Sequence, residues 1–172
     1  MTAELKSGSR LIIQNFDSQF LRLHSRACSL ISTTPLELIY GGVVKSQTAA
    51  MPSMGEQLLR SAAAVERTFG GINANLWDDP FEWTLPEHLS TRERIDEYLG
   101  EVEATRHQAF ARFQSDSDLL KEVLVPSGKT CPLIVLLTET LVKAADYQGR
   151  AIATLRLVSN GRYPELHLWN RR

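Results

Sequence analysis

The chain has 172 residues, 43% of them hydrophobic and 23% charged, and its formal net charge is -1. A chain of this length and composition can bury a core as one domain, residues 1–172, without disulfide or metal crosslinks, which excludes the disordered and fibrous classes. The balanced charge lacks the basic excess that neutralises phosphate backbones, so nucleic acid is not an expected partner.

Cysteine usage and hydropathy favour a soluble cytoplasmic protein. Cys28 and Cys131 lie far apart and belong to no CxxC or Cys/His pattern, so neither a zinc knuckle nor a disulfide framework is indicated. The first residues do not resemble a secretory signal. The longest apolar run, residues 132–137, is too short to span a bilayer, and we expect no membrane contact.

A first amphipathic helix is predicted over residues 9–31. Apolar side chains recur there every three to four residues, which places them on one helical face: Leu11, Ile12, Phe16, Phe20, Leu23, Cys28 and Leu30. Pro35 ends this pattern. A short helical turn at residues 36–40 and two glycines then lead into a loop that runs to about Pro52.

A second helix is predicted over residues 53–72. Ser53 and Glu56 form a capping box, in which each side chain can satisfy a free backbone amide at the helix start. Gly70 and Gly71 lower helix propensity, so we expect the helix to end or fray there, or to extend only weakly to Asn75. Residues 76–89 hold two Trp, two Pro and four acidic residues without periodicity, which indicates a long loop with aromatic anchors.

Two further helices are predicted, over residues 90–114 and 132–159. Ser90 and Glu93 offer a second capping box, and a short amphipathic piece at residues 117–124 follows the third helix. Pro132 suits the first position of the fourth helix, and Asn160 with Gly161 supplies a left-handed stop. The tail from Tyr163 to Trp169 is expected to fold back on the bundle.

Four long amphipathic helices without a persuasive strand predict an all-α four-helix bundle. The chain has too many connections of about 14 or more residues for a minimal up-and-down arrangement. We therefore expect one long crossover connection. Ligand sites in such bundles lie between facing helices.

Several stretches together resemble the DinB/YfiT-like four-helix bundle family. Their order and spacing, more than any one of them, carry the resemblance: residues 34–38 (TPLEL), 52–58 (PSMGEQL), 66–69 (ERTF), 148–152 (QGRAI) and 154–157 (TLRL). Members of that family typically hold a divalent metal with three histidines, one on the second helix and two, four residues apart, on the fourth.

The resemblance places these three positions on Arg60, Lys143 and Tyr147, or on Ser61 instead of Arg60 if the register shifts by one. None of the three is a usual metal ligand, and two are cations that would repel an ion. The four histidines, His24, His88, His107 and His167, show no ligand spacing. We therefore expect no metal and no cofactor.

Two interpretations of Arg60, Lys143 and Tyr147 remain open. Charged neighbours on the same helices, Glu56, Glu139 and Asp146, could pair with them and fill the vacant metal site with salt bridges. Alternatively, the two cations and the phenol could bind a small anionic ligand such as a carboxylate, with Arg60 as a fork-shaped donor.

Three further features carry expectations of their own. Arg106 interrupts an apolar line, and we expect its stem to cover the core while its head reaches water. Cys131 stands at a predicted helix start, which favours a thiolate, but it has no neighbouring base in the sequence. Trp77, Phe81 and Trp83 could cover a ligand pocket or simply plug the end of the bundle.

The favoured function is a metal-free small-ligand-binding or interaction module that forms a homodimer. The alternative, which the resemblance implies if metal is bound, is a metal-dependent thiol S-transferase or hydrolase. Metal content separates the two.

Overall fold

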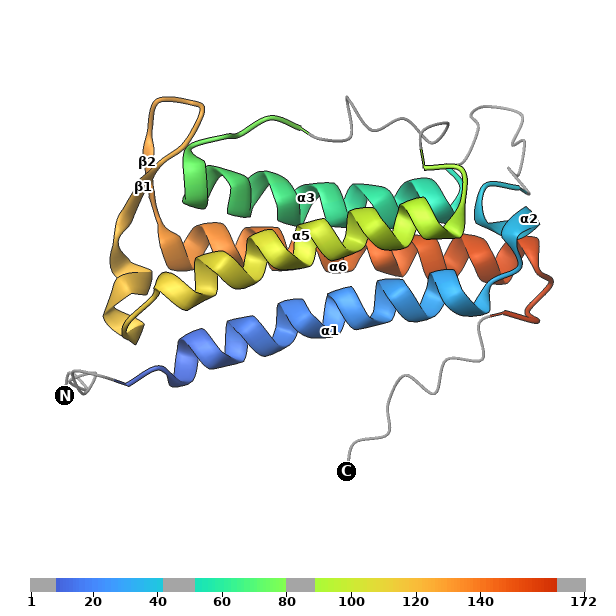
Figure 1. Cartoon of the computed structure of the whole chain (residues 1–172), viewed down its shortest axis with the longest axis horizontal. Helices are drawn as coiled ribbons and strands as arrows, with labels where there is room; N and C mark the ends of the chain where they lie inside the picture. The colour runs from blue at the N-terminus through green and yellow to red at the C-terminus, as the bar shows by residue number, and fades with distance from the viewer. Residues whose placement is uncertain (1–8, 42–51, 80–88, 164–172) are drawn as a thin grey trace.

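The structure is a computed structural model, and it describes residues 9–41, 52–79 and 89–163. In these ranges the chain forms four long helices that pack side by side, with a short hairpin at one end (Figure 1). The long helices are α1 (Leu11–Thr33), α3 (Met54–Ala74), α5 (Arg92–Arg112) and α6 (Leu133–Val158), and a single turn, α2 (Leu36–Ile39), follows α1. The all-α prediction is confirmed.

Hydrogen bonds between α3 and α5 show that these two helices are parallel. Tyr98 Oη donates to Glu66 at 2.7 Å, and seven residues further along both helices Asn73 Nδ2 donates to the carbonyl of Thr105 at 2.9 Å. A connection between parallel neighbours must return along the length of the bundle. The chain between α3 and α5 is therefore the crossover expected from the sequence.

The other pairs of neighbouring helices complete the arrangement. Ser61 Oγ donates to the carbonyl of Ala144 at 2.9 Å, whereas Thr68 contacts Thr140 at 2.7 Å, so α3 and α6 run antiparallel. In Figure 1, α1 runs in the direction of α6 and opposite to α3 and α5. The direction of the four long helices is therefore up, down, down, up.

The capping box at the start of α3 is confirmed, and the helix ends two residues beyond the predicted Ile72. Ser53 Oγ accepts from the amide of Glu56 at 3.2 Å, and the Glu56 carboxylate accepts from the amide of Ser53 at 2.6 Å, as a capping box requires. The helix does not end at the glycines but continues to Ala74, and left-handed Asn75 (φ 56°) caps it. A Cβ on Gly71 would lie 2.5 Å from the Trp77 ring, so glycine there permits close packing.

The start of α5 differs by one residue from the expected capping box. Thr91, rather than Ser90, is the N-cap, and its Oγ1 accepts from the amide of Arg94 at 3.3 Å. Ser90 and Thr91 are both good capping residues, so local sequence does not decide between them.

A hairpin that the sequence did not indicate precedes α6. After a 3-10 helix, η1 (Asp116–Leu120), the strands β1 (Glu122–Leu124) and β2 (Thr130–Pro132) pair antiparallel. Three-residue strands are too short to show alternation, so the periodicity gave no signal. Pro132 ends β2 and is the N-cap of α6 instead of its first residue. The predicted stop of α6 is confirmed by the left-handed Asn160 and Gly161.

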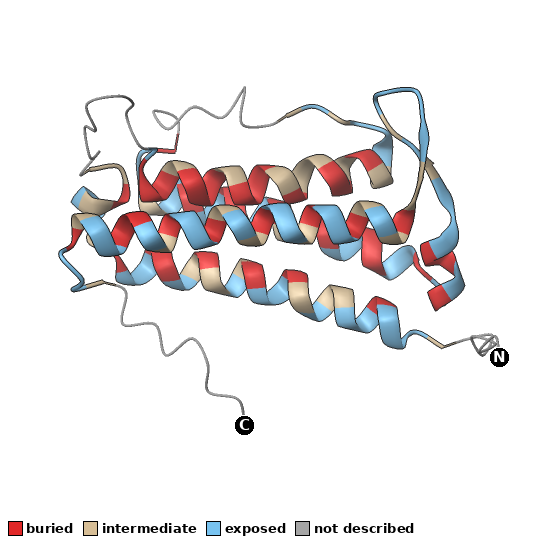
Figure 2. Cartoon of the chain, turned by 180° about the vertical axis from the view of Figure 1, so that it is seen from behind, coloured by how far each residue is buried: buried red, intermediate tan, exposed pale blue. Residues whose placement is uncertain are grey.

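Buried residues lie on the inner faces of all four long helices (Figure 2). Aromatic rings from three helices meet at the centre: Phe20 and Phe69 lie edge to face at 5.1 Å between centroids, and the Phe69 and Phe110 rings are tilted to each other at 5.5 Å. None of the described helices is long and apolar enough to cross a membrane. Phe81, Trp83, His88 and the tail beyond Tyr163 lie outside the described residues.

Candidate functional site

A groove of about 310 Å³ lies on the outer seam between α3 and α6, where the hairpin reaches this side of the bundle. Its apolar walls come from Ala64, Leu136 and the hairpin residues Val125 and Pro126. The volume falls at the lower end of the range of small-molecule sites, about 300–1,000 Å³. The groove is therefore the cavity that we describe as the candidate functional site.

The floor of the groove is a pair of buried hydroxyl groups, Thr68 and Thr140. The Thr140 hydroxyl donates to the carbonyl of Leu136 at 2.8 Å, so its single proton is already used. The 2.7 Å contact between the two hydroxyls therefore requires Thr68 to be the donor. Thr68 Oγ1 keeps only lone pairs, which makes the floor a hydrogen-bond acceptor.

The rim of the groove carries two cations, Arg67 and Lys143, and one carboxylate, Glu139. Arg67 is half-buried, and its Nε donates to the carbonyl of Trp77 at 2.9 Å, which holds the guanidinium beside the groove. Within the described ranges neither cation forms an ion pair. The excess of positive charge favours an anion in the groove.

Trp77 forms one edge of the groove with its indole ring held in place. The ring packs against Gly71, and the indole Nε1 donates to Asn75 Oδ1 at 2.9 Å. Of the two roles left open for Trp77, covering a pocket or plugging the end of the bundle, this position corresponds to the first. A fixed aromatic ring beside two cations suits a ligand that has an apolar or aromatic body as well as a negative charge.

The three residues singled out from the sequence lie along this seam, but they do not share one cavity. Lys143 lines the groove, whereas Arg60 and Tyr147 do not. Arg60 precedes the groove residue Ala64 by one turn of α3, and Tyr147 follows Lys143 by one turn of α6. Because the two helices are antiparallel, Arg60 and Tyr147 both lie about one turn beyond the groove.

The surroundings of Tyr147 include a cation that the sequence analysis did not consider. The Arg150 guanidinium lies 5.6 Å from the centre of the Tyr147 ring and pairs with Asp146 at 2.5 Å. One predicted neighbour, Asp146, thus forms a salt bridge with Arg150.

The resemblance first placed the three positions on Arg60, Lys143 and Tyr147. The side chains that point into the bundle belong to the residues one position later in each case. Ser61, Ala144 and Gln148 are buried, whereas Arg60 and Tyr147 are half-buried and Lys143 is exposed. No group of three or more His, Cys, Asp or Glu in the described part of the chain is arranged to hold a metal ion.

One contact that the sequence analysis missed joins His24 and Cys28 on α1. The Cys28 sulfur lies 3.6 Å from His24 Nε2, at the helical spacing of four residues that could have revealed it. Burial, and then the negative charge of Asp96, raise the pKa of the Cys28 thiol. The thiol is therefore kept protonated, which is the reverse of what a nucleophile needs.

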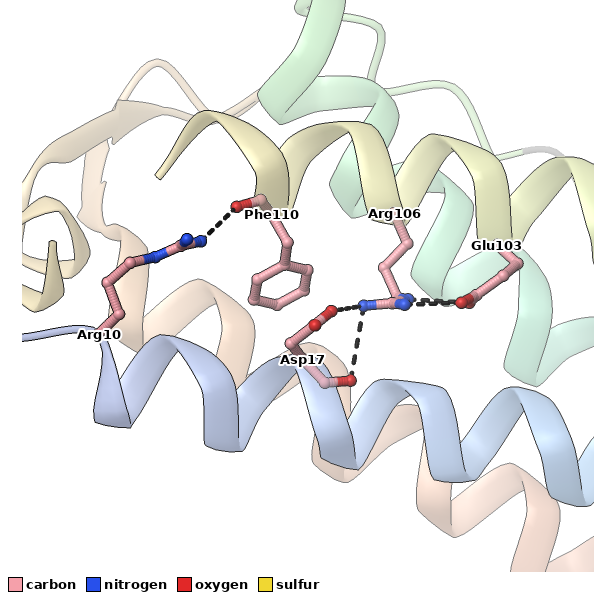
Figure 3. A network of polar contacts seen from close by, with 5 residues as sticks. All are labelled: Arg10, Asp17, Glu103, Arg106 and Phe110. Carbon is pink, nitrogen blue, oxygen red and sulfur yellow. Dashed lines mark hydrogen bonds and ion pairs between the residues drawn. The ribbon is translucent and has the colours of Figure 1, made fainter. Parts of the chain in front are cut away.

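Arg106 is a buried cation that pairs with two partly exposed carboxylates between α1 and α5 (Figure 3). Its side chain is only 3% exposed. Nε and one terminal nitrogen donate to the Glu103 carboxylate at 2.8 and 2.6 Å, and the other terminal nitrogen pairs with Asp17. The expectation that the guanidinium reaches water is wrong, because α1 supplies the partner carboxylate.

No family of known proteins, no curated protein and no solved structure matches this chain.

Proposed function

We propose that this chain is a DinB/YfiT-like bundle that binds a small anionic ligand in the α3–α6 groove without a metal ion. The observation that carries the proposal is the pair Arg67 and Lys143, which face a cavity of about 310 Å³ and have no carboxylate partner among the described residues. A carboxylate between them would receive charge-assisted hydrogen bonds.

The walls and floor of the groove narrow the ligand class. Trp77 and the apolar hairpin residues favour an aromatic or branched aliphatic body, and Thr68 offers an acceptor to a hydroxyl or amine on that body. We therefore infer a small carboxylate with an apolar body. The resemblance itself is supported by the crossover between α3 and α5 and by the quoted stretches, and it stays a proposal, as do the cytoplasmic location and the homodimer.

Binding can be measured by titrating the purified protein calorimetrically with benzoate and branched aliphatic carboxylates, each compared with its neutral primary amide. The acids are expected to bind more tightly than the amides. Lys143→Gln is expected to weaken binding about tenfold, which corresponds to roughly 1.4 kcal/mol. Arg156→Gln removes the same charge from an exposed position near the end of α6 and should leave binding unchanged.

Two results would contradict this proposal. The groove would lose its assignment if no acid bound better than its amide, or if both variants weakened binding equally. Stoichiometric zinc, nickel or manganese in protein exposed to each metal would instead support the metal-dependent S-transferase or hydrolase.

A further inference from the structure

A small, partly enclosed space lies between the four long helices, separate from the groove. It measures about 30 Å³, and all four long helices contribute to its lining. The polar residues around it are His24 from α1, Ser61 from α3, Glu103 and Arg106 from α5, and Gln148 from α6. A water molecule needs at least about 10–15 Å³ of such space, so the cavity has room for one small guest but not for a ligand of several heavy atoms.

Gln148 is the lining side chain that determines which kind of molecule can bind in the cavity. It is 2% exposed, and its Nε2 donates to the carbonyl of Leu23 at 2.8 Å. That bond fixes the amide orientation, because the flipped amide would place two oxygen atoms against each other. The carbonyl oxygen, Oε1, has no hydrogen-bond partner within the described ranges. Buried polar atoms are rarely left unpaired, so a partner is expected in the cavity.

The hydroxyl of Ser61 also offers lone pairs to a guest that donates a hydrogen bond. The Ser61 hydroxyl proton is used on the carbonyl of Ala144 at 2.9 Å, so only lone pairs of Ser61 Oγ remain. Arg106 already donates to Glu103 and Asp17. These three charged side chains carry a net negative charge, which disfavours an anion in the cavity.

We propose that the central cavity binds a single-heavy-atom hydrogen-bond donor, either water or an ammonium ion, which donates to Gln148 Oε1. This site does not depend on the function proposed for the groove. It would complete the hydrogen bonding of a polar cluster in which each of the four long helices takes part.

A crystal structure at a resolution that shows ordered waters, determined without ammonium salts, tests the proposal directly. We expect one isolated density peak within hydrogen-bond distance of Gln148 Oε1. In solution, the Gln148 side-chain amide protons should show a nuclear Overhauser effect to a long-lived water. An empty cavity, or a Gln148 oxygen bonded to another protein group, would overturn the proposal.

A thermal titration separates the two guests. A rise in Tm that saturates with ammonium chloride, is absent with sodium chloride and is lost in Gln148→Met would identify ammonium. Equal behaviour in the two salts, together with the density peak, would identify water. If Gln148→Met does not fold, the density in the unaltered protein still decides whether a guest is bound, and comparison of the two salts identifies it.

Discussion

The seam between α1 and α5 and the outer seam between α3 and α6 both contain basic side chains, but the surroundings of these side chains differ. In the α1–α5 seam, the Arg106 guanidinium is buried and paired with two carboxylates (Figure 3). In the α3–α6 seam, Arg67 and Lys143 face an open groove without ion-pair partners among the described residues. Buried and paired charge holds helices together, whereas accessible and unpaired charge is available to a ligand.

The largest expected effect is at Arg106. Arg106→Ala leaves the carboxylates of Asp17 and Glu103 without their donor, and hydrogen bonds to charged groups contribute about 1.5–3 kcal/mol to the free energy of unfolding. A loss of that size is expected in urea denaturation. Arg156→Ala, at an exposed position on α6, should change the free energy by less than about 0.5 kcal/mol. Equal effects of the two variants would remove the distinction between buried and exposed charge.

The second largest expected effect is a loss of stability in Gly71→Ala, at the edge of the groove. In Gly71→Ala the new Cβ would lie 2.5 Å from the Trp77 ring, and overpacking of this kind costs about 1–3 kcal/mol. We expect lower stability and an altered near-ultraviolet circular dichroism signal from the displaced indole. Gly149→Ala, where no atom lies within 4 Å of the added Cβ, should instead stabilise α6 by about 0.5–1 kcal/mol. An unchanged aromatic signal in Gly71→Ala would show that Trp77 does not pack there.

A pH-dependent effect is expected where η1 meets α5. The Lys121 ammonium, and then the amides of Gln114 and Ser115, lower the pKa of Asp118 to about 2. A carboxyl whose pKa is lowered on folding stabilises the protein above its unfolded pKa of about 4 and loses this contribution as the pH falls towards 2. Asp118→Asn should therefore flatten the fall in Tm between about pH 4 and pH 2. If the Tm of Asp118→Asn fell as steeply with decreasing pH as that of the unaltered protein, this role of Asp118 would be contradicted.

The smallest expected effect is the change in the free energy of unfolding caused by Lys143→Gln. Lys143 is exposed and unpaired among the described residues, so the free energy of unfolding should stay within about 0.5 kcal/mol of its original value. A clear loss of stability without ligand would mean that Lys143 serves the fold. Basic side chains would then stabilise the fold in both seams, and the two seams would not differ in this respect.

Local sequence was sufficient for features whose cause lies within one turn of the chain. The capping box of Ser53 and Glu56 and the left-handed stop at Asn160 and Gly161 each depend on neighbouring residues, and both were predicted correctly. Apolar periodicity likewise predicted the four long helices, because each has one buried face. The all-α class follows from these local signals.

Tertiary structure decided which polar side chains meet. The partners of Arg106 include Asp17 from another helix, 89 residues away in the sequence. The resemblance left a choice of one residue between Arg60 and Ser61, and only the packing of α3 against α6 turned Ser61 inward. The hairpin, with three-residue strands stabilised by pairing with each other, completed the groove beside Lys143. Sequence determined the helices because their causes are local, and only the fold determined the sites because their parts come from different helices.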